Sequence, residues 1–427
     1  MVRTLVSIWK TPDLRNKILF TIGVVVVFRI LAFIPIPGAD QQALKDFFSQ
    51  SQLLQLLDLF SGGTLLNFSI VALGLNPYIN ASIIMQLLTV AIPKLEELQK
   101  EGEYGRQKIN QYTRFLTVPL SVIQSYGVFI LLQRSGVSVL GEVGPLQIIS
   151  IIVTMAAGTL LLMWLGELIT EQGIGNGISI LIFSGIIVRL PITLGQTVQV
   201  INTDNLIKIA LVLAAALLVI VVVVVVNEGH RRILVQYARR VRGDRLVGGQ
   251  TTHLPIRVNQ AGVIPIIFAV SVILLPGMIG TFLSTSSNPQ IADIAANVRD
   301  FFNNTAYYST IYFILVISFT YFYTAVTFNP TKIADDLKKY GGFIPGIRPG
   351  LATSQYIAYI LNRITLVGGV FLGAVAILPF IIKDLTDIST LAIGGTGLLI
   401  VVSVVLETSK QLESQLIMRS YEGFITK

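Results

Sequence analysis

The sequence predicts an all-α polytopic membrane protein with ten transmembrane helices, arranged as an inverted repeat of two pseudo-symmetric five-helix halves. Three observations lead to this fold class: the composition, the spacing of the apolar runs and the placement of the basic residues. The 427-residue chain is 53% hydrophobic and 13% charged, and its mean hydropathy is +0.74. This composition is too apolar for a soluble globular domain.

Apolar runs of roughly the length that crosses a bilayer, about 20 helical residues, recur along the whole chain. The ten predicted spans are Ile18–Ile36, Asn76–Ile92, Phe115–Leu132, Ile148–Ile169, Ile174–Leu194, Leu206–Val226, Ala261–Phe282, Thr310–Phe328, Ile364–Ile382 and Leu391–Leu406. Because the number is even, both termini are expected on one side of the membrane.

Lysine and arginine decide which side that is, since they accumulate in cytoplasmic loops. Arg29 lies within the first span, and most other basic residues fall in the termini and in the loops that share their side. The opposite loops hold only Lys45, Arg134, Arg189, Lys208, Arg299 and Lys383. We therefore predict that both termini are cytoplasmic.

The second span of each predicted half is interrupted. The stretch Leu53–Ile92 is broken at Ser61-Gly62-Gly63, at Gly74 and at Asn76-Pro77, which predicts a short amphipathic segment at Leu57–Leu66 before the span itself. The matching span of the second half opens with Asn259-Gln260-Ala261-Gly262-Val263-Ile264-Pro265. Interruptions at matching positions of two repeats, here 1–203 and 204–427, indicate a transport path. We favour this interpretation over the ordinary tolerance of membrane helices for Gly and Pro.

Charged residues are scarce within the spans. Arg29 lies in the first span, and Glu167 and Glu171 lie at the cytoplasmic end of the fourth. Arg29 is interpreted as a functional charge, as a structural partner of another helix or as a snorkelling side chain. The sequence contains no cysteine, no phosphate-binding loop and no metal-ligand or nucleophile motif. We therefore expect no enzyme activity, no cofactor, no metal and no ion coupling.

Two long loops, about 227–260 and 329–363, are predicted on the cytoplasmic side. The first contains His230–Val258, with seven arginines against the single acidic residue Asp244. These arginines either fix the topology beside anionic lipids or dock on an acidic partner such as the phosphates of RNA. In the second loop, Gly346-Ile347-Arg348-Pro349-Gly350 predicts a stiff turn that holds Arg348 outward.

Several segments, in order along the chain, resemble the signature segments of bacterial SecY proteins. They are Arg29-Ile30, Phe33-Ile34-Pro35-Ile36-Pro37-Gly38, Phe60-Ser61-Gly62-Gly63, Asn76-Pro77-Tyr78-Ile79, Ala81-Ser82-Ile83-Ile84, Gly173-Ile174-Gly175-Asn176-Gly177-Ile178-Ser179, Thr252-His253-Leu254-Pro255, Ala261-Gly262-Val263-Ile264-Pro265, Phe328-Asn329-Pro330 and Phe343-Ile344-Pro345-Gly346-Ile347-Arg348-Pro349-Gly350. The resemblance implies an hourglass channel that passes unfolded secretory polypeptides and opens sideways to lipid.

The resemblance also implies site residues. Leu57–Leu66 becomes a plug helix, with Leu57, Phe60, Ser61, Gly62, Gly63, Leu65 and Leu66 as its named members. The implied pore ring consists of Leu75, Ile79, Ile178, Ile182, Ile267 and Ile400. The implied polar cluster of the lateral gate consists of Asn80, Gln124 and Asn259. Spacing alone would favour simple helix packing for the ring positions.

Partners follow from the same resemblance. Arg239, Arg240, Arg242, Arg245 and Arg348 are expected to contact the SecA ATPase or the ribosome, including its RNA. Further expected partners are the SecE and SecG subunits, signal peptides, nascent and secretory polypeptides, and membrane lipids. The implied location is the bacterial cytoplasmic membrane. Two other classes stay open at this stage: a secondary transporter for a small solute and a membrane-embedded enzyme.

Overall fold

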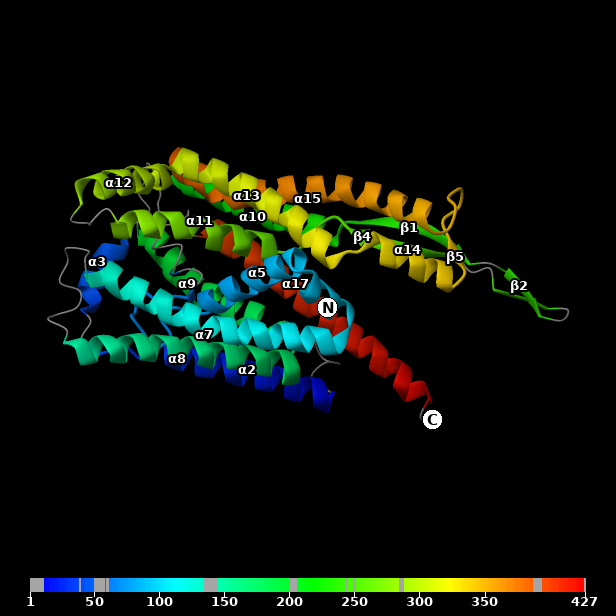
Figure 1. Cartoon of the computed structure of the whole chain (residues 1–427), viewed down its shortest axis with the longest axis horizontal. Coiled ribbons are helices and arrows are strands. Elements are labelled where there is room, and N and C mark those ends of the chain that lie inside the picture. The colour runs from blue at the N-terminus through cyan, green and yellow to red at the C-terminus, as the bar shows by residue number, and fades with distance from the viewer. Residues whose placement is uncertain are drawn as a thin grey trace. The chain divides into compact units, whose positions relative to one another are not determined.

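The structure of the chain is a computed structural model (Figure 1). It describes residues 11–37, 40–49, 58, 61–133, 144–199, 206–237, 239–242, 245–248, 251–283, 288–386 and 394–425. The chain forms two compact units. Unit 1 comprises Met1–Val212, Val270–Tyr308 and Pro379–Lys427, and unit 2 comprises Leu213–Ala269 and Ser309–Leu378. The predicted halves, 1–203 and 204–427, divide the chain differently and stay a prediction.

Each of the ten apolar runs falls on a helix. The helices are α2 (Pro12–Phe33), α5 (Asn76–Ala91), α7 (Glu103–Gln133), α8 (Pro145–Gln172), α9 (Gly177–Gln199), α10 (Leu206–Glu228), α11 (Ile264–Leu283), α13 (Thr305–Thr327), α15 (Leu351–Thr386) and α17 (Gly394–Ile425). Within the described residues, five stretches are long and apolar enough to cross a membrane: α2, α7, α8, Thr305–Lys339 and Leu351–Ile382. A sixth is formed if α5 and α6 (Pro93–Lys100), which meet at a 100° bend, count as one broken span.

Short helices that the sequence analysis did not anticipate lie between the long ones: α3 (Gln41–Ser49), α6, α12 (Pro289–Asn303) and α14 (Pro330–Lys339). An Asn-Pro pair starts both α12 and α14. The Asn329 side chain accepts hydrogen bonds from the backbone N–H groups of Thr331 and Lys332, at 3.0 and 3.1 Å. The proline that follows has no N–H to leave unsatisfied in the first turn. The sequence Asn329-Pro330 is therefore a local helix-start signal.

The first basic loop forms β-strands that the sequence analysis did not anticipate. Strands β1 (His230–Tyr237) and β4 (Thr251–Arg257) pair antiparallel, with Ile233 opposite Leu254, and β5 (Gly342–Phe343) pairs with the other edge of β1. Ile233 and Val235 are buried while Leu234 is exposed, the alternation expected of a strand with one covered face. This face packs in a cluster formed by Ile233, Ile256, Ile344, Ile357 and Leu361.

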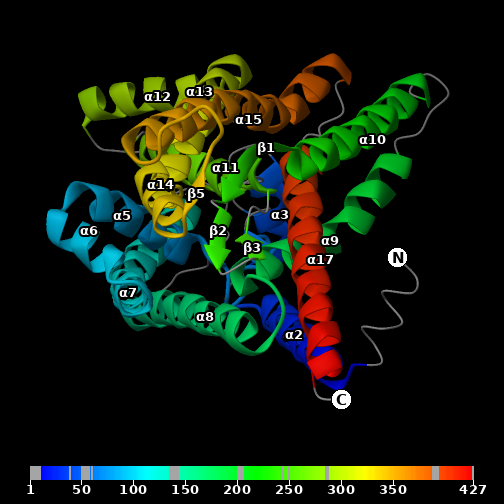
Figure 2. The same cartoon turned by 90° about the vertical axis from the view of Figure 1, so that its right-hand side faces the viewer.

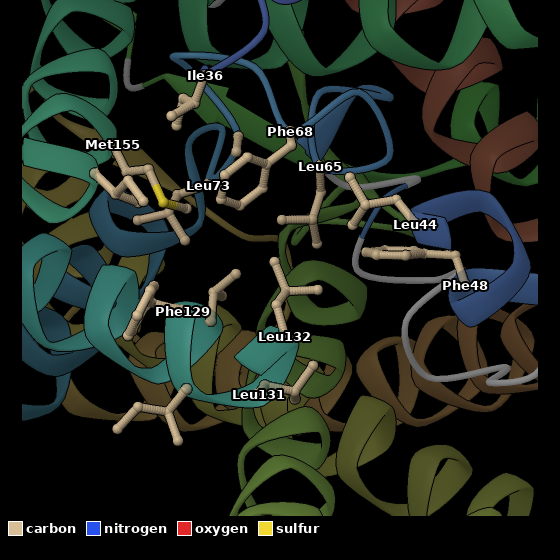
Figure 3. Close-up of a cluster of buried hydrophobic side chains, with 14 residues drawn as sticks. Ile36, Leu44, Phe48, Leu65, Phe68, Leu73, Phe129, Leu131, Leu132 and Met155 are labelled. Carbon is tan, nitrogen blue, oxygen red and sulfur yellow. The ribbon is translucent and has the colours of Figure 1, made fainter. Parts of the chain in front are cut away.

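A cluster of buried apolar side chains in unit 1 surrounds the turns that precede α5 (Figure 3). It joins Ile36 after α2, Leu44 and Phe48 of α3, the end of α7 and Met155 of α8. Phe68 lies within it, fully buried, with φ 43°. A bulky side chain in the left-handed region is strained, and the surrounding core holds it there. The segment before α5 is therefore packed into the interior of unit 1.

Candidate functional site

The segment before α5 forms a chain of turns. Leu57 and Phe60 of the predicted plug helix lie outside the described residues, and from Gly62 to Leu75 the backbone makes turns rather than a helix. Gly62, Gly63 and Gly74 have φ values of 78°, 85° and 58°, which glycine adopts without the strain of a Cβ. These glycines explain locally why an apolar stretch of spanning length folds back on itself. Helix α5 then starts at Asn76, as predicted.

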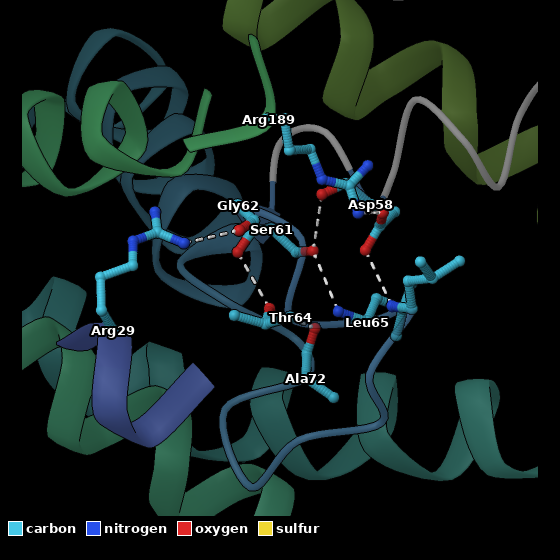
Figure 4. A network of polar contacts seen from close by, with 9 residues as sticks. Arg29, Asp58, Ser61, Gly62, Thr64, Leu65, Ala72 and Arg189 are labelled. Carbon is cyan, nitrogen blue, oxygen red and sulfur yellow. Dashed lines mark hydrogen bonds and ion pairs between the residues drawn. The ribbon is translucent and has the colours of Figure 1, made fainter. Parts of the chain in front are cut away.

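Asp58 organises the start of this turn segment (Figure 4). Its Oδ1 accepts a 2.8 Å hydrogen bond from the backbone N–H of Leu66, and its backbone carbonyl accepts one from Gly63 N at 2.8 Å and one from Ser61 Oγ at 2.9 Å. The Asp58 side chain is only 1% exposed. A buried carboxylate requires hydrogen bonds and a counter-charge, and Leu66 N supplies one such hydrogen bond.

Two arginines from different helices contact the segment. Arg189 of α9 forms an ion pair with Asp58, with 21% of the arginine side chain exposed. Arg29 of α2 donates to the carbonyl of Gly62 at 3.1 Å and to Ser184 Oγ of α9 at 3.3 Å (Figure 4). Arg29 is therefore a structural partner of another helix, one of the three interpretations left open by the sequence. The assignment of Arg189, Lys208 and Lys383 to outer loops is wrong, because they lie within α9, α10 and α15.

The ring positions on α9 share a face with Arg189. Ile178, Ile182, Gly185 and Arg189 follow one another at spacings of four, three and four residues, which at about 100° per residue keeps them on one stripe of a helix. Ile182 is 4% exposed and Ile178 is half-buried. One face of α9 thus carries two predicted ring residues and, further along, the residues that contact the turn segment.

The other ring positions lie on or directly before three other helices. Leu75 and Ile79 are one turn apart, since Ile79 N donates to the Leu75 carbonyl at 3.0 Å, and both are buried. Ile400 is 1% exposed on α17, which packs against α9 (Figure 2). Ile267 lies on α11 in unit 2. Packing of α9 against α17 therefore connects the helices that carry Ile178, Ile182 and Ile400. A ring closed by all six residues remains a prediction.

The predicted gate residues fall in both units. Asn80 and Gln124 lie on α5 and α7, which pack against each other in unit 1. Asn259, in unit 2, donates through Nδ2 to Asn227 Oδ1 at 2.9 Å and to the Gly262 carbonyl at 3.1 Å. The sequence analysis missed Asn227. The sequence does contain a signal for this residue. Asn227 follows the apolar run of α10, and a polar side chain at the end of such a run needs a hydrogen-bond partner.

The arginines predicted to contact partners lie on two paired strands, which the sequence analysis did not predict, and in the turn around Arg348, which it did. Arg239, Arg240, Arg242 and Arg245 lie on β2 (Arg239–Arg242) and β3 (Arg245–Gly248), which pair antiparallel; Figure 1 shows β2 beyond the ends of β1 and β4. Arg348 is exposed in a turn between Gly346 and Gly350, whose φ values are 80° and 103°. Thr353 Oγ1 donates to the Arg348 carbonyl at 2.9 Å, which fixes the turn.

Unit 1 contains apolar helices around a folded-back segment, and unit 2 contains a basic hairpin and a basic turn. Together these features define a helical membrane protein of the channel or transporter class. Comparison with known proteins narrows this class. The SecY family model matches residues 69–409. A protein translocase subunit SecY from Streptomyces scabiei is 45% identical, and one from Mycobacterium bovis is 44% identical, each over the full length of both chains. The chain therefore belongs to the SecY family.

Solved structures share its fold at low sequence identity. A structure described as a protein conducting channel has a TM-score of 0.63 at 19% identity and covers 94% of this chain and 93% of its own. A second structure, reported in work on the plug domain of the SecY protein, has a TM-score of 0.64 at 20% identity. The match covers 94% of this chain and 92% of that chain. Canine Sec61 in a ribosome-channel complex from the endoplasmic reticulum has a TM-score of 0.60 at 20% identity, covering 94% and 93%.

Proposed function

We propose that this chain is a protein-conducting channel, which passes unfolded secretory polypeptides across the membrane and releases hydrophobic segments sideways into lipid through a lateral gate. The observation that carries the proposal is the face of α9, on which Ile178 and Ile182 precede the residues that hold the folded-back segment. The full-length relatives named protein translocase subunit SecY support it.

An aliphatic ring suits such a path for a physical reason. Aliphatic side chains at a constriction exclude water and so block ions. They offer a passing polypeptide no specific hydrogen bond, and their shape adapts to many side chains. Within this proposal, Leu75, Ile79, Ile178, Ile182, Ile267 and Ile400 form the ring, Leu57–Leu66 forms the plug, and Asn80, Gln124 and Asn259 form the polar cluster of the gate.

Energy and assembly come from partners in this proposal. The SecA ATPase or the ribosome drives transport by contacting the β2–β3 hairpin and Arg348, and the SecE and SecG subunits accompany the chain. The support is the concentration of arginine in these two places and the ribosome complex in which one structural neighbour was solved. In this proposal the channel lies in the bacterial cytoplasmic membrane. Both termini lie in the cytoplasm, an orientation that the distribution of basic residues supports.

Site-specific photocrosslinking tests the polypeptide path. A photoreactive residue replaces Ile178 or Ile267 in membranes that contain this protein, and a secretory chain is stalled midway through transport. We expect adducts at both positions because the ring surrounds the chain. Val221 of α10, which is 60% exposed, is the control facing away from the path. Equal adducts at Val221, or none at the ring positions, would favour a carrier for a small solute instead.

Charge reversal tests the partner surface. Arg348→Glu is expected to weaken binding of SecA or ribosomes about tenfold, equivalent to about 1.4 kcal/mol, because it replaces an attraction to an acidic partner by a repulsion. Arg257→Glu, at an exposed position of β4 in the same unit, serves as the control. Binding is measured by cosedimentation with vesicles at several salt concentrations. A loss of equal size in both variants would show a general charge effect and not a docking position.

A further inference from the structure

We propose that one face of α12 (Figure 1) is a lipid-binding surface, which inserts into the bilayer interface opposite the predicted cytoplasmic side. Ile291, Ile294, Val298 and Phe301 form this face, the apolar stripe of α12. Its ligand is the acyl-chain region of a phospholipid bilayer, irrespective of the charge of the headgroups. The surface goes beyond the proposed transport function, because it depends only on the position of the chain in a membrane.

The side chains of α12 divide into arcs around the helix axis. At about 100° per residue, the apolar stripe occupies one arc, in which Ile294 is 67% exposed, Ile291 43% and Phe301 42%. Exposed apolar side chains on one arc of a short helix, with polar ones on another, are typical of a helix that lies in a membrane interface. The polar arc carries the exposed residues Asp293, Asn297 and Asp300.

A third arc of α12 is fixed against the end of α11. A Cβ added to Gly280 of α11 would lie 3.0 Å from Arg299 N and 3.2 Å from the Ala295 carbonyl oxygen. The two backbones therefore meet where glycine leaves room for them. On α11, Ile279 and Leu283 are 56% and 37% exposed. Because α11 carries one of the predicted spans, these side chains face lipid in a membrane, and α12 crosses α11 beside them.

The connection to the next predicted span keeps the end of α12 at the membrane surface. Asn304 alone separates α12 from α13; its Oδ1 accepts a hydrogen bond from Ala306 N at 3.0 Å, and its N–H donates to the Asp300 carbonyl at 3.1 Å. Across this corner Phe301 stacks on Tyr307, with ring centroids 4.9 Å apart. Tyr307 is 54% exposed. Exposed aromatic rings at the end of a span are typical of the interface between acyl chains and headgroups.

The charges of α12 identify the kind of ligand. The helix contains two acidic residues, Asp293 and Asp300, against the single basic residue Arg299, and Arg299 pairs with Asp300 at 2.9 Å. Helices that bind membranes through anionic headgroups carry several Lys and Arg residues on the polar face. Attraction to anionic headgroups therefore does not explain α12. Burial of the apolar stripe among acyl chains does, and it acts in zwitterionic and anionic membranes alike.

Quenching of a fluorescent label measures where the apolar stripe lies. The chain contains no cysteine, so Ile294→Cys in the full-length chain takes a single NBD label, and Asp293→Cys gives the matched label about 100° away on the polar arc. Both proteins are reconstituted into phosphatidylcholine vesicles with or without brominated acyl chains. We expect brominated chains to quench the label at position 294 at least about threefold more than the label at position 293, and aqueous iodide on both sides to show the opposite order.

A carboxylate placed on either arc tests whether the apolar stripe itself holds the helix in lipid. With the label on Ile291→Cys, the added change Ile294→Asp should lower quenching by brominated chains at least about threefold, since a carboxylate is costly to bury. Asn297→Asp adds the same group on the polar arc and should leave the quenching unchanged. Ile294 and Asn297 are both exposed in the structure, so neither change disturbs the contact with α11.

Two results would overturn the lipid-binding surface. Equal iodide quenching at positions 293 and 294, without quenching by brominated chains, would place the apolar stripe in water, where it is open to a protein partner. Quenching by brominated chains only after phosphatidylglycerol is added would show recognition of headgroup charge instead of insertion of the stripe. The measurement uses neither a motor nor a secretory chain. A failure of transport therefore leaves the lipid contact standing, and an absence of lipid contact leaves the proposed channel function standing.

Discussion

Replacement of Ile182 by Asn is expected to make the resting channel leak ions. In the proposed ring, an aliphatic constriction excludes water, and an amide at this position offers hydrogen bonds to water and lowers the cost of hydrating the path. A reduction of this cost by about 1.4 kcal/mol corresponds to about a tenfold rise in ion passage. We therefore expect at least that increase in conductance across a planar bilayer that contains the purified channel.

Leu181→Asn is the matched control for this leak. Leu181 precedes Ile182 on α9 and is 1% exposed, against 4% for Ile182, so both variants bury an amide at a cost of roughly 1–3 kcal/mol in stability. The two side chains point about 100° apart around the helix. A leak in Leu181→Asn as large as in Ile182→Asn would mean that the leak reports loosened packing and that Ile182 does not line the constriction.

Replacement of Gly177 by Ala is expected to destabilise unit 1 severely. A Cβ at this position would overlap the carbonyl oxygen of Gly166 and lie 2.7 Å from its carbonyl carbon. Gly177 N also donates to Thr170 Oγ1 at 2.9 Å, so the start of α9 is fixed on the end of α8. Overpacking costs about 1–3 kcal/mol where side chains can move, and here the obstacle is backbone. We therefore expect Gly177→Ala to lower the free energy of unfolding by about 3 kcal/mol or more. The measurement is the midpoint of unfolding in detergent, which should decrease.

Gly23→Ala tests whether that loss is specific to the close contact. Gly23 lies in α2, where a Cβ meets no atom within 4 Å, and an alanine in a helix interior is more favourable than glycine by up to about 1 kcal/mol. This variant should therefore unfold at the same temperature as the unsubstituted chain or at a slightly higher one. A decrease equal to that of Gly177→Ala would indicate a general intolerance of these helices to substitution of glycine.

Local sequence signals determined the helices and several of their boundaries. Each predicted span falls on a helix because apolar runs of this length have no alternative way to satisfy their backbone groups in a membrane. The start of α5 at Asn76 and the exposed turn around Arg348 were also predicted, since proline and glycine impose their backbone geometry on their immediate neighbours. Strands β1 and β4 were missed because the alternation that identifies them lies within a highly charged loop.

Only the tertiary structure revealed the partners of the charged residues. Arg29 and Ser184 are 155 positions apart in the sequence, and Asp58 and Arg189 come from segments separated by three long helices. Hydrophobic periodicity reports which residues are apolar along one element, but it carries no information about which elements meet. The sequence by itself therefore determined a polytopic helical membrane protein with a broken second span. The contact of Asp58 and Gly62 with α9 depends on the ion pair to Arg189 and the close approach to Gly185, which exist only when distant helices pack together.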